Sequence, residues 1–244
     1  MSDVQQQDFS YFPGCSMATT AAESNRSLMQ AARILGLNLI ELQDWNCCGS
    51  ASAQTMCKNL SLGMAARNLS LAPPGRPLVA MCPRCLHYLR SAQICLIDDP
   101  KTREDLEEKW GRPIPTDLEI IHFMEVLVRY GLDRLQANAR RSLKGLRFVP
   151  YYGCTLFRPP RLAKEKYFQG EMENILTALG AEAVPYALTY RCCGSRKLRL
   201  HRPGRYPLAC SAARILGKAS SARARISSSV RSWMGCGTYT TAGS

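Results

Sequence analysis

Two short segments of this chain each place two adjacent cysteines directly before a glycine. They read DWNCCGS at residues 44–50 and YRCCGS at residues 190–195. Consecutive cysteines usually point apart, so they are awkward to place in an ordinary core and suit a cluster of several metal atoms better than one tetrahedral ion. We therefore expect both doublets to take part in chemistry rather than in core packing.

The total cysteine content bears on the cellular compartment. The chain has 12 cysteines in 244 residues, and its first segment, MSDVQQQDFSYF, lacks the basic start, apolar stretch and cleavage site of a signal peptide. We therefore expect a reduced, cytoplasmic setting, in which such a chain binds metal or performs redox chemistry rather than forming a disulfide framework. No apolar run approaches the roughly 18 residues that cross a bilayer, so no transmembrane segment is expected.

The charge is unevenly distributed. Residues 195–244 hold ten of the 32 Lys and Arg residues and none of the 19 acidic residues. The rest of the chain has 22 basic and 19 acidic groups, so it is nearly neutral despite a net charge of +13. Because no recognisable nucleic-acid-binding module accompanies the basic tail, we expect no nucleic-acid partner.

Strand and helix patterns alternate along the first half. Strands are predicted at residues 8–14, 37–45 and 76–81, with a helix from 17 to 36 and another in which Met56, Leu60 and Met64 share one face. Thr116–Glu119 has the spacing of a capping box, which predicts a helix running to Tyr130 and ending at Gly131. This alternation predicts an α/β fold.

The second half repeats this order. A strand ending in Gly-Cys at residues 146–154 precedes a helical segment at 171–180 and the second doublet. Cys154 follows Cys15 by 139 positions, and Cys192 follows Cys47 by 145. We therefore predict two pseudo-repeated domains with short parallel-type sheets flanked by helices, at residues 1–131 and 145–244.

The cysteines of the first half form three groups, each after a predicted strand. They are Cys15, the pair Cys47 and Cys48, and the pair Cys82 and Cys85. Because ligands gather at the carboxyl ends of strands in open α/β sheets, we expect these five thiols to converge. Thiolates suit iron-sulfur clusters, zinc or Cu(I). The Cys-x-x-Cys alone would favour structural zinc, whereas the full set favours an iron-sulfur cluster, which Gly49 would let the backbone approach.

This pattern resembles the cysteine-rich CCG domain found in the B subunits of heterodisulfide reductases. The segments YFPGCS and YYGCTLFRP also resemble the repeat openings of that family, and the similarity covers roughly residues 9–194. The resemblance implies a noncubane 4Fe-4S cluster at which disulfides are cleaved. It implies Cys15, Cys47, Cys48, Cys82 and Cys85 as the ligands of a first cluster, and Cys154, Cys192 and Cys193 as part of a second set.

The resemblance also implies a function and partners. It indicates an oxidoreductase component that acts on a disulfide or thiol substrate, with electrons delivered by a C-type iron-sulfur protein and a flavin-containing A-type protein of the same kind of complex. The chain itself has no Gly-x-Gly-x-x-Gly nucleotide fingerprint. Two alternatives stay open: an iron-sulfur subunit of a quinone-linked dehydrogenase of lactate, glycerol-3-phosphate or succinate type, and a non-catalytic zinc-bearing or structural subunit. No catalytic residue beyond the ligands is assigned.

The last 50 residues depart from the family pattern. A second Cys-x-x-Cys is expected near residues 228–235, where the chain has SSSVRSWMGCG with the single Cys236. We interpret the second domain as truncated or aberrant after residue 194, by a frameshift or a similar event. The alternatives are a natural basic tail and, for the second half, a vestigial repeat or a zinc site.

The remaining cysteines and histidines of interest have simpler interpretations. Cys57 and Cys95 fall in predicted helices with apolar neighbours, and we expect them to be buried thiols without a chemical role. His87, His122 and His201 have no partner spacing typical of a metal site, and we expect surface or packing positions for them.

Overall fold

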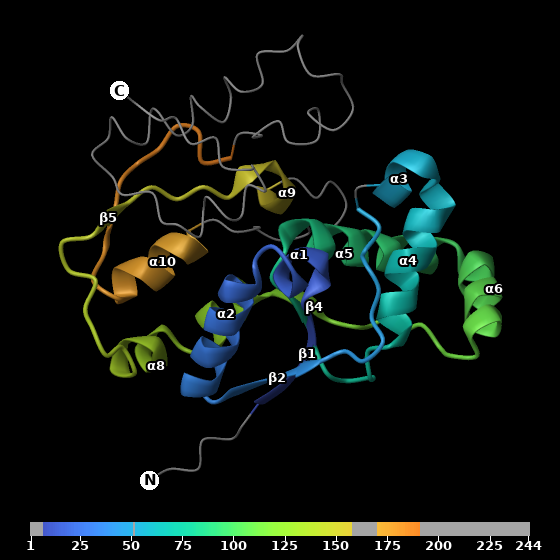
Figure 1. The fold of residues 1–244 in the computed structure, drawn as a ribbon, viewed down its shortest axis with the longest axis horizontal. Coiled ribbons are helices and arrows are strands. Elements are labelled where there is room, and N and C mark those ends of the chain that lie inside the picture. The colour runs from blue at the N-terminus through green and yellow to red at the C-terminus, as the bar shows by residue number, and fades with distance from the viewer. Residues whose placement is uncertain (1–6, 51, 158–169, 191–244) are drawn as a thin grey trace.

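The first half of the protein is built on a parallel sheet (Figure 1). The computed structural model describes residues 7–50, 52–157 and 170–190. The sheet has four strands in the order β2-β1-β3-β4, and every neighbouring pair is parallel. The strands are β1 (Gln7–Phe12), β2 (Leu37–Glu41), β3 (Leu78–Ala80) and β4 (Ile120–His122). The prediction of an α/β fold with short parallel sheets flanked by helices is confirmed.

Helices connect the strands. In the first half they are α1 (Gly14–Ala18), α2 (Ala22–Ile34), α3 (Ser52–Met56), α4 (Lys58–Ser70), α5 (Pro83–Asp98), α6 (Pro100–Trp110), α7 (Phe123–Tyr130) and α8 (Leu132–Ala137). The described part of the second half contains β5 (Arg147–Phe148), α9 (Gly153–Phe157), α10 (Glu171–Ala178) and β6 (Glu182–Ala183).

The sheet carries one hydrophobic core on each face. Along β1, Phe9 and Tyr11 point into the core formed with α2 and α7, whereas Phe12 points into the core formed with α4 and α5. Strand β3 divides in the same way, because Val79 belongs to the first core and Leu78 to the second. Successive side chains of each strand thus alternate between the two faces of the sheet, and both faces are covered by helices, as in buried parallel sheets.

The strand order places a topological switch point at the carboxyl ends of β1 and β3. The chain leaves β1 through α2 to reach β2 on one side, then crosses back through α4 to reach β3 on the other side. Helices α2 and α4 therefore cover opposite faces of the sheet. The carboxyl ends of two strands flanking such a switch point are where ligands bind in open α/β folds.

The second half packs onto the first. Its strands β5 and β6 form a separate two-stranded parallel sheet, and α10 lies against α7 and α8 (Figure 1). Tyr152 and Leu156 enter the same core as α4 and α5. The predicted domain limits at residues 131 and 145 stay a prediction, and the tail at 195–244 lies outside the described residues.

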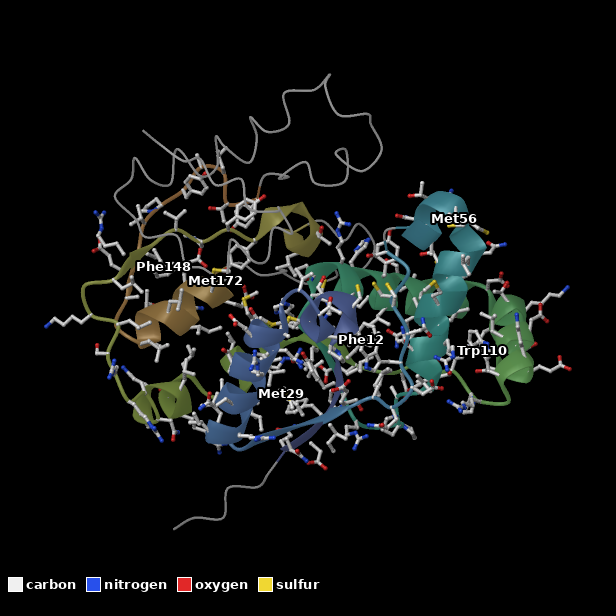
Figure 2. All side chains as sticks on the ribbon, viewed as in Figure 1. Phe12, Met29, Met56, Trp110, Phe148 and Met172 are labelled. Atoms are coloured by element: carbon white, nitrogen blue, oxygen red, sulfur yellow. The ribbon has the colours of Figure 1, made fainter. Side chains whose placement is uncertain are left out.

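Two local predictions are wrong. The helix predicted after Thr116–Glu119 begins only at Phe123, because residues 120–122 add a fourth strand beside β3. The prediction that Met56, Leu60 and Met64 share one helical face is wrong as well, because the segment divides at Cys57 into α3 and α4. Met56 is 79% exposed and Leu60 is 48% exposed, and Met56 lies on the outer end of the molecule in Figure 2. The inward face of α4 carries alanines, polar side chains and Leu69.

Candidate metal centre

The three cysteine groups of the first half all follow strands. Cys15 lies in α1, three residues after β1 ends. Cys47 and Cys48 lie in the loop between β2 and α3. Cys82 is the N-cap of α5, directly behind β3, and Cys85 lies in the first turn of that helix. The fold therefore places the three groups near the carboxyl ends of β1 and β3.

The five thiols form a continuous series of neighbours. The Sγ atoms of Cys47 and Cys15 are 3.9 Å apart. Cys48 makes side-chain hydrogen bonds with Cys47 and Cys85, and Cys85 makes one with Cys82. The five thiols are thus linked as neighbours in series, and their role as ligands around one cofactor stays a prediction.

One side of this group is buried and the other faces solvent. Cys48 and Cys85 are 2% and 3% exposed, Cys47 and Cys82 are partly buried, and Cys15 is exposed. The solvent-facing edge of the group is therefore at Cys15 and Cys47, and Cys48 and Cys85 form its buried side.

Mutual hydrogen bonds shift the pKa values of four of the thiols in opposite directions. Hydrogen bonds with Cys47 and then with Cys85 lower the pKa of Cys48. The hydrogen bond with Cys85 lowers the pKa of Cys82 to about 7, with help from backbone amides at the start of α5. The pKa values of Cys47 and Cys85 are raised, chiefly by their hydrogen bonds with Cys48. Cys48 and Cys82 are therefore the first to become thiolates.

A glycine permits the close approach of α1 to α5. Gly14 has a φ of 69°, and a Cβ atom at this position would lie 2.8 Å from the Sγ atom of Cys85. Any other residue would displace either Cys15 or Cys85. The same need for a small residue holds at Gly49, where a Cβ atom would lie 3.1 Å from the Cα atom of Ser61 in α4. The predicted approach of the Gly49 backbone to a cluster stays a prediction.

Several residues that hold the cysteines carried no motif in the sequence. Asn68 and Ser61 are buried polar residues of α4 that hydrogen-bond to the backbone of the doublet loop. His122 is 1% exposed, and its Nε2 atom lies 2.7 Å from the carbonyl oxygen of Met81, the residue before Cys82. The prediction of a packing position for His122 is confirmed. The only signal of these roles in the sequence is a polar residue inside an apolar segment, because such a residue needs a hydrogen-bond partner when it is buried.

The described part of the second half brings together residues that precede its cysteine positions. The amides of Tyr152 and Gly153 both donate to the carbonyl oxygen of Thr189, at 3.0 and 3.1 Å, and the rings of Tyr152 and Tyr190 are stacked with centroids 5.8 Å apart. Tyr152 is two residues before Cys154, and Tyr190 is two residues before Cys192.

The first half has an equivalent aromatic pair. The rings of Phe12 and Trp45, which precede Cys15 and Cys47, meet edge to face at 5.5 Å. The predicted repeat is therefore visible in the packing that precedes each cysteine site. Cys192 and Cys193 lie outside the described residues, and of Cys154 the structure describes its place in α9.

The burial predicted for two further cysteines is wrong. Cys57 and Cys95 are both exposed rather than buried. Cys57 precedes the first residue of α4, at the joint with α3, and Cys95 lies on the outer face of α5, opposite Leu89 and Leu96, which face the core. Apolar neighbours in sequence did not indicate which face of the helix a thiol would occupy.

The donor set fits an iron-sulfur cofactor. It offers five soft sulfur ligands, and hydrogen bonds lower the pKa of two of them. Within residues 7–50, 52–157 and 170–190, no three His, Cys, Asp or Glu side chains are arranged around one point as ligands of a single metal ion.

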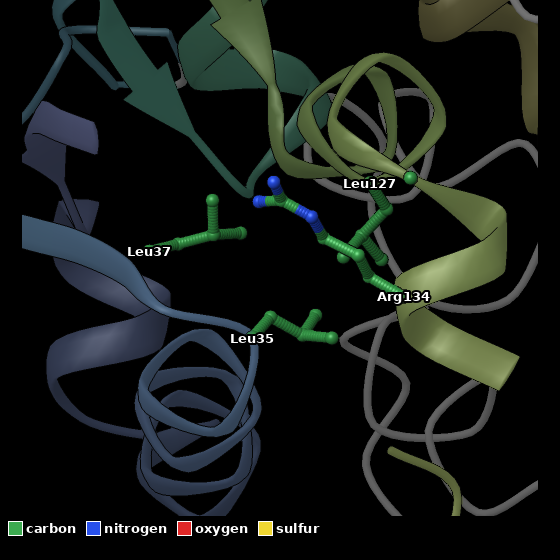
Figure 3. A pocket seen from close by; sticks show the side chains of 5 residues that line it. Leu35, Leu37, Leu127 and Arg134 are labelled. Carbon is green, nitrogen blue, oxygen red and sulfur yellow. The ribbon is translucent and has the colours of Figure 1, made fainter. Parts of the chain in front are cut away.

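A pocket elsewhere is unrelated to the cysteines. It is lined by Leu35, Leu37, Leu127, Gly131 and Arg134. Leu37 begins β2, so this pocket lies toward the amino ends of the strands, away from the thiols. In Figure 3 the side chain of Arg134 reaches between the leucines.

Comparison with known families decides how the cysteine pattern is classified. The family model described as CCG, cysteine-rich domain, matches residues 9–90 and 148–205. The chain belongs to the cysteine-rich CCG domain family. The two matched segments of this CCG protein contain all eight cysteines assigned from the sequence, which confirms the resemblance stated above.

Curated relatives are named components of reductases. The protein is 31% identical over 196 residues to the 8-methylmenaquinol:fumarate reductase membrane anchor subunit of Wolinella succinogenes, covering 78% of this chain and 68% of that one. It is 24% identical to a protein of Archaeoglobus profundus named as similar to the B subunit of heterodisulfide reductase, covering 80% and 69%. It is 27% identical to the B subunit of the ferredoxin/F(420)H(2)-dependent CoB-CoM heterodisulfide reductase of Methanosarcina acetivorans, covering 76% and 64%.

A solved structure shares the fold. The crystal structure of a hypothetical protein from Helicobacter pylori matches 76% of this CCG protein and 34% of its own chain, with a TM-score of 0.56 and 12% identity. Among the helices of the described residues, none combines the length and the apolar character needed to cross a membrane.

Proposed function

We propose that this CCG protein is the B-type component of a heterodisulfide reductase-like complex. The observation that carries the proposal is the gathering of five thiols at the carboxyl ends of β1 and β3, with one solvent-facing edge. We assign Cys15, Cys47, Cys48, Cys82 and Cys85 as ligands of a noncubane 4Fe-4S cluster. Cys154, Cys192 and Cys193 are assigned to part of a second set.

The residues of the chain have distinct roles in this proposal. A bound cluster supplies one-electron steps and an iron that accepts sulfur, so that a disulfide can be reduced in two stages. Cys48 and Cys82 provide the most readily ionised thiols of the group, because hydrogen bonds already lower the pKa of each. The amides at the start of α5 stabilise the negative charge at Cys82. Cys15 lies at the open edge, where a substrate sulfur can approach.

Electrons come from partner proteins in this proposal. The relatives are named as parts of multisubunit reductases, and the sequence has no nucleotide fingerprint of its own. A C-type iron-sulfur protein and a flavin-containing A-type protein would deliver them, in the cytoplasm.

A quinone-linked role is the second candidate. It is favoured by the 31% identity to a component of an 8-methylmenaquinol:fumarate reductase. In that case the same five thiols would hold a cluster that exchanges electrons with a quinone instead of cleaving a disulfide.

The reducible substrate separates the two candidates. Protein purified without oxygen is reduced with titanium(III) citrate, and its reoxidation by an aliphatic disulfide or by menadione is followed by visible absorption and EPR. We expect faster reoxidation by the disulfide, with a new EPR signal from a sulfur-bound state. Reoxidation by menadione alone would favour the quinone-linked role.

The cofactor itself is tested through Cys48. We expect wild-type protein to contain iron and acid-labile sulfide in nearly equal amounts. Cys48→Ser should lose most of the visible absorption, because it removes the buried thiolate at the centre of the group. Cys95→Ser is the matched control, since Cys95 is exposed on the same chain and lies outside the group. Zinc without sulfide in the wild type, or unchanged iron in Cys48→Ser, would contradict the assignment.

A further inference from the structure

The loop that carries the doublet is held by a buried side chain of α4. The amide of Asn46 donates to Oδ1 of Asn68 at 2.9 Å, and Nδ2 of Asn68 donates to the carbonyl oxygen of Asn46 at 2.8 Å. Asn68 is fully buried. Its amide thus pairs with both backbone groups of the residue immediately before Cys47.

A second side chain of α4 binds the same loop. Nη1 of Arg67 donates to the carbonyl oxygen of Asp44 at 2.7 Å and to Oδ1 of Asn46 at 2.9 Å. The Nδ2 atom of Asn46 in turn donates to the carbonyl oxygens of Cys47 and Met64, at 2.8 and 3.0 Å. Backbone groups before the doublet are therefore paired with α4 rather than with solvent.

The end of the loop that follows the doublet is attached to α4 about two helical turns before Asn68. The hydroxyl of Ser61 donates to the carbonyl oxygen of Gly49 at 3.1 Å, and Ser61 is seven residues before Asn68 on the same face of α4. The doublet thus lies between two attachment points. Both use backbone atoms, so the thiols of Cys47 and Cys48 are left to interact with the other cysteines.

These contacts explain why a helix core contains an asparagine. A buried amide without partners is costly, and Asn68 finds the partners named above in the doublet loop. Its neighbour Leu69 is equally buried but belongs to the hydrophobic core. Two adjacent residues of α4 therefore serve different purposes, one positioning the loop and the other packing the core.

We propose that Asn68 is a positioning residue for the candidate metal centre: it holds the doublet loop in the shape that presents Cys47 and Cys48 before any cofactor binds. The role toward a cofactor rests on the proposed function, whereas the hold on the loop concerns the cofactor-free chain. Ligands that are already in place lose less conformational freedom when a cofactor binds.

The hold on the loop is tested by the reactivity of Cys48. Cofactor-free, reduced protein is treated with N-ethylmaleimide, and modification is mapped by mass spectrometry. Cys48 is 2% exposed, and the exposed Cys95 is the internal reference. We expect Asn68→Ala to raise the rate at Cys48 relative to Cys95 by about tenfold, because its buried hydrogen bonds are lost.

A core variant separates positioning from general destabilisation. Leu69→Val weakens the packing of the same helix turn and should leave the relative rate at Cys48 within about twofold of wild type. An unchanged rate in Asn68→Ala, or an equal increase in Leu69→Val, would overturn the proposal. If Asn68→Ala does not fold, Arg67→Lys decides by the same criterion with an expected increase of about threefold, since the partly exposed Arg67 binds the same loop.

Cofactor uptake tests the second part. After anaerobic reconstitution with iron and sulfide, we expect Asn68→Ala to bind less iron than Leu69→Val and to show a broadened EPR signal. Equal uptake and identical spectra would refute a role toward the cofactor. If wild type itself takes up no iron, the proposed function fails, while the alkylation result still decides whether Asn68 holds the loop.

Discussion

At the scale of single residues, position 49 after the doublet requires glycine for reasons of backbone conformation and packing. Gly49 has a φ of 77°, and a Cβ atom there would lie 3.1 Å from the Cα atom and 3.2 Å from the carbonyl oxygen of Ser61. Gly75 has a similar φ of 71° but open space around it. Alanine substitutions at the two positions therefore separate the free-energy cost of the backbone conformation from that of a steric clash.

We expect Gly49→Ala to lower the free energy of unfolding by about 2–4 kcal/mol, since it combines a left-handed backbone with a collision against α4. The control Gly75→Ala should cost only about 1 kcal/mol. Urea denaturation followed by circular dichroism measures both. Equal losses in the two variants would show that α4 moves aside without cost.

At the scale of elements, the junction of β4 and α7 shows how a strand end is fixed. His122 caps α7 by accepting a hydrogen bond from the amide of Met124 at its Nδ1 atom, and Glu125 accepts from the amide of His122. Nε2 of His122 therefore carries the proton and donates to the carbonyl oxygen of Met81. Burial lowers the pKa of His122 to about 4, so the imidazole is neutral at pH 7.

This depressed pKa predicts a loss of stability in acid. Below about pH 6.5 the unfolded chain binds a proton that the folded protein binds only near pH 4, so the free energy of unfolding falls as the pH falls through this window. Between pH 7.5 and 5 the contribution of His122 is about 2 kcal/mol. Urea midpoints across this range measure it.

A matched variant isolates this contribution. His122→Gln lacks the titrating ring but retains an amide that can donate to the carbonyl oxygen of Met81. The difference in stability between wild type and His122→Gln should shrink on acidification, because the other titrating groups cancel. A difference that is constant from pH 7.5 to 5 would mean that His122 takes up its proton in the folded protein as readily as in the unfolded chain.

At the scale of the whole molecule, the two halves share a core. Tyr152 is 2% exposed and belongs to the same hydrophobic cluster as Leu86 and Leu89 of α5. Its hydroxyl donates to Glu173 and accepts from the amide of Met172. A side chain of the second repeat thus completes the packing of the first.

We expect Tyr152→Ala to destabilise both halves together, by about 3–5 kcal/mol, because it empties a shared core position. Tyr152→Phe keeps the ring and should cost about 1–2 kcal/mol for the lost hydrogen bonds. Hydrogen exchange with mass spectrometry should show faster exchange in β1 and β3 as well as in the second half. Unchanged protection of β1 and β3 would indicate that the halves unfold independently.

The sequence by itself determined the family, the α/β class and the positions of the cysteine groups. Those features depend on spacing along the chain: strands end at residues where cysteines begin, and the doublets recur with aromatic residues before them. The prediction that Cys15, Cys47 and Cys82 follow strands held because a buried parallel strand is a short apolar run that can be recognised locally.

Tertiary structure decided what depends on contacts between distant segments. Residues 120–122 became a strand because β3 offered them a pairing edge, although local spacing favoured a helix. Cys57 and Cys95 became exposed because the orientation of each helix is set by its neighbours. Asn68 obtained its role only when α4 folded onto a loop 22 residues earlier, since a hydrogen-bond partner so far along the chain leaves no periodic signal in the sequence.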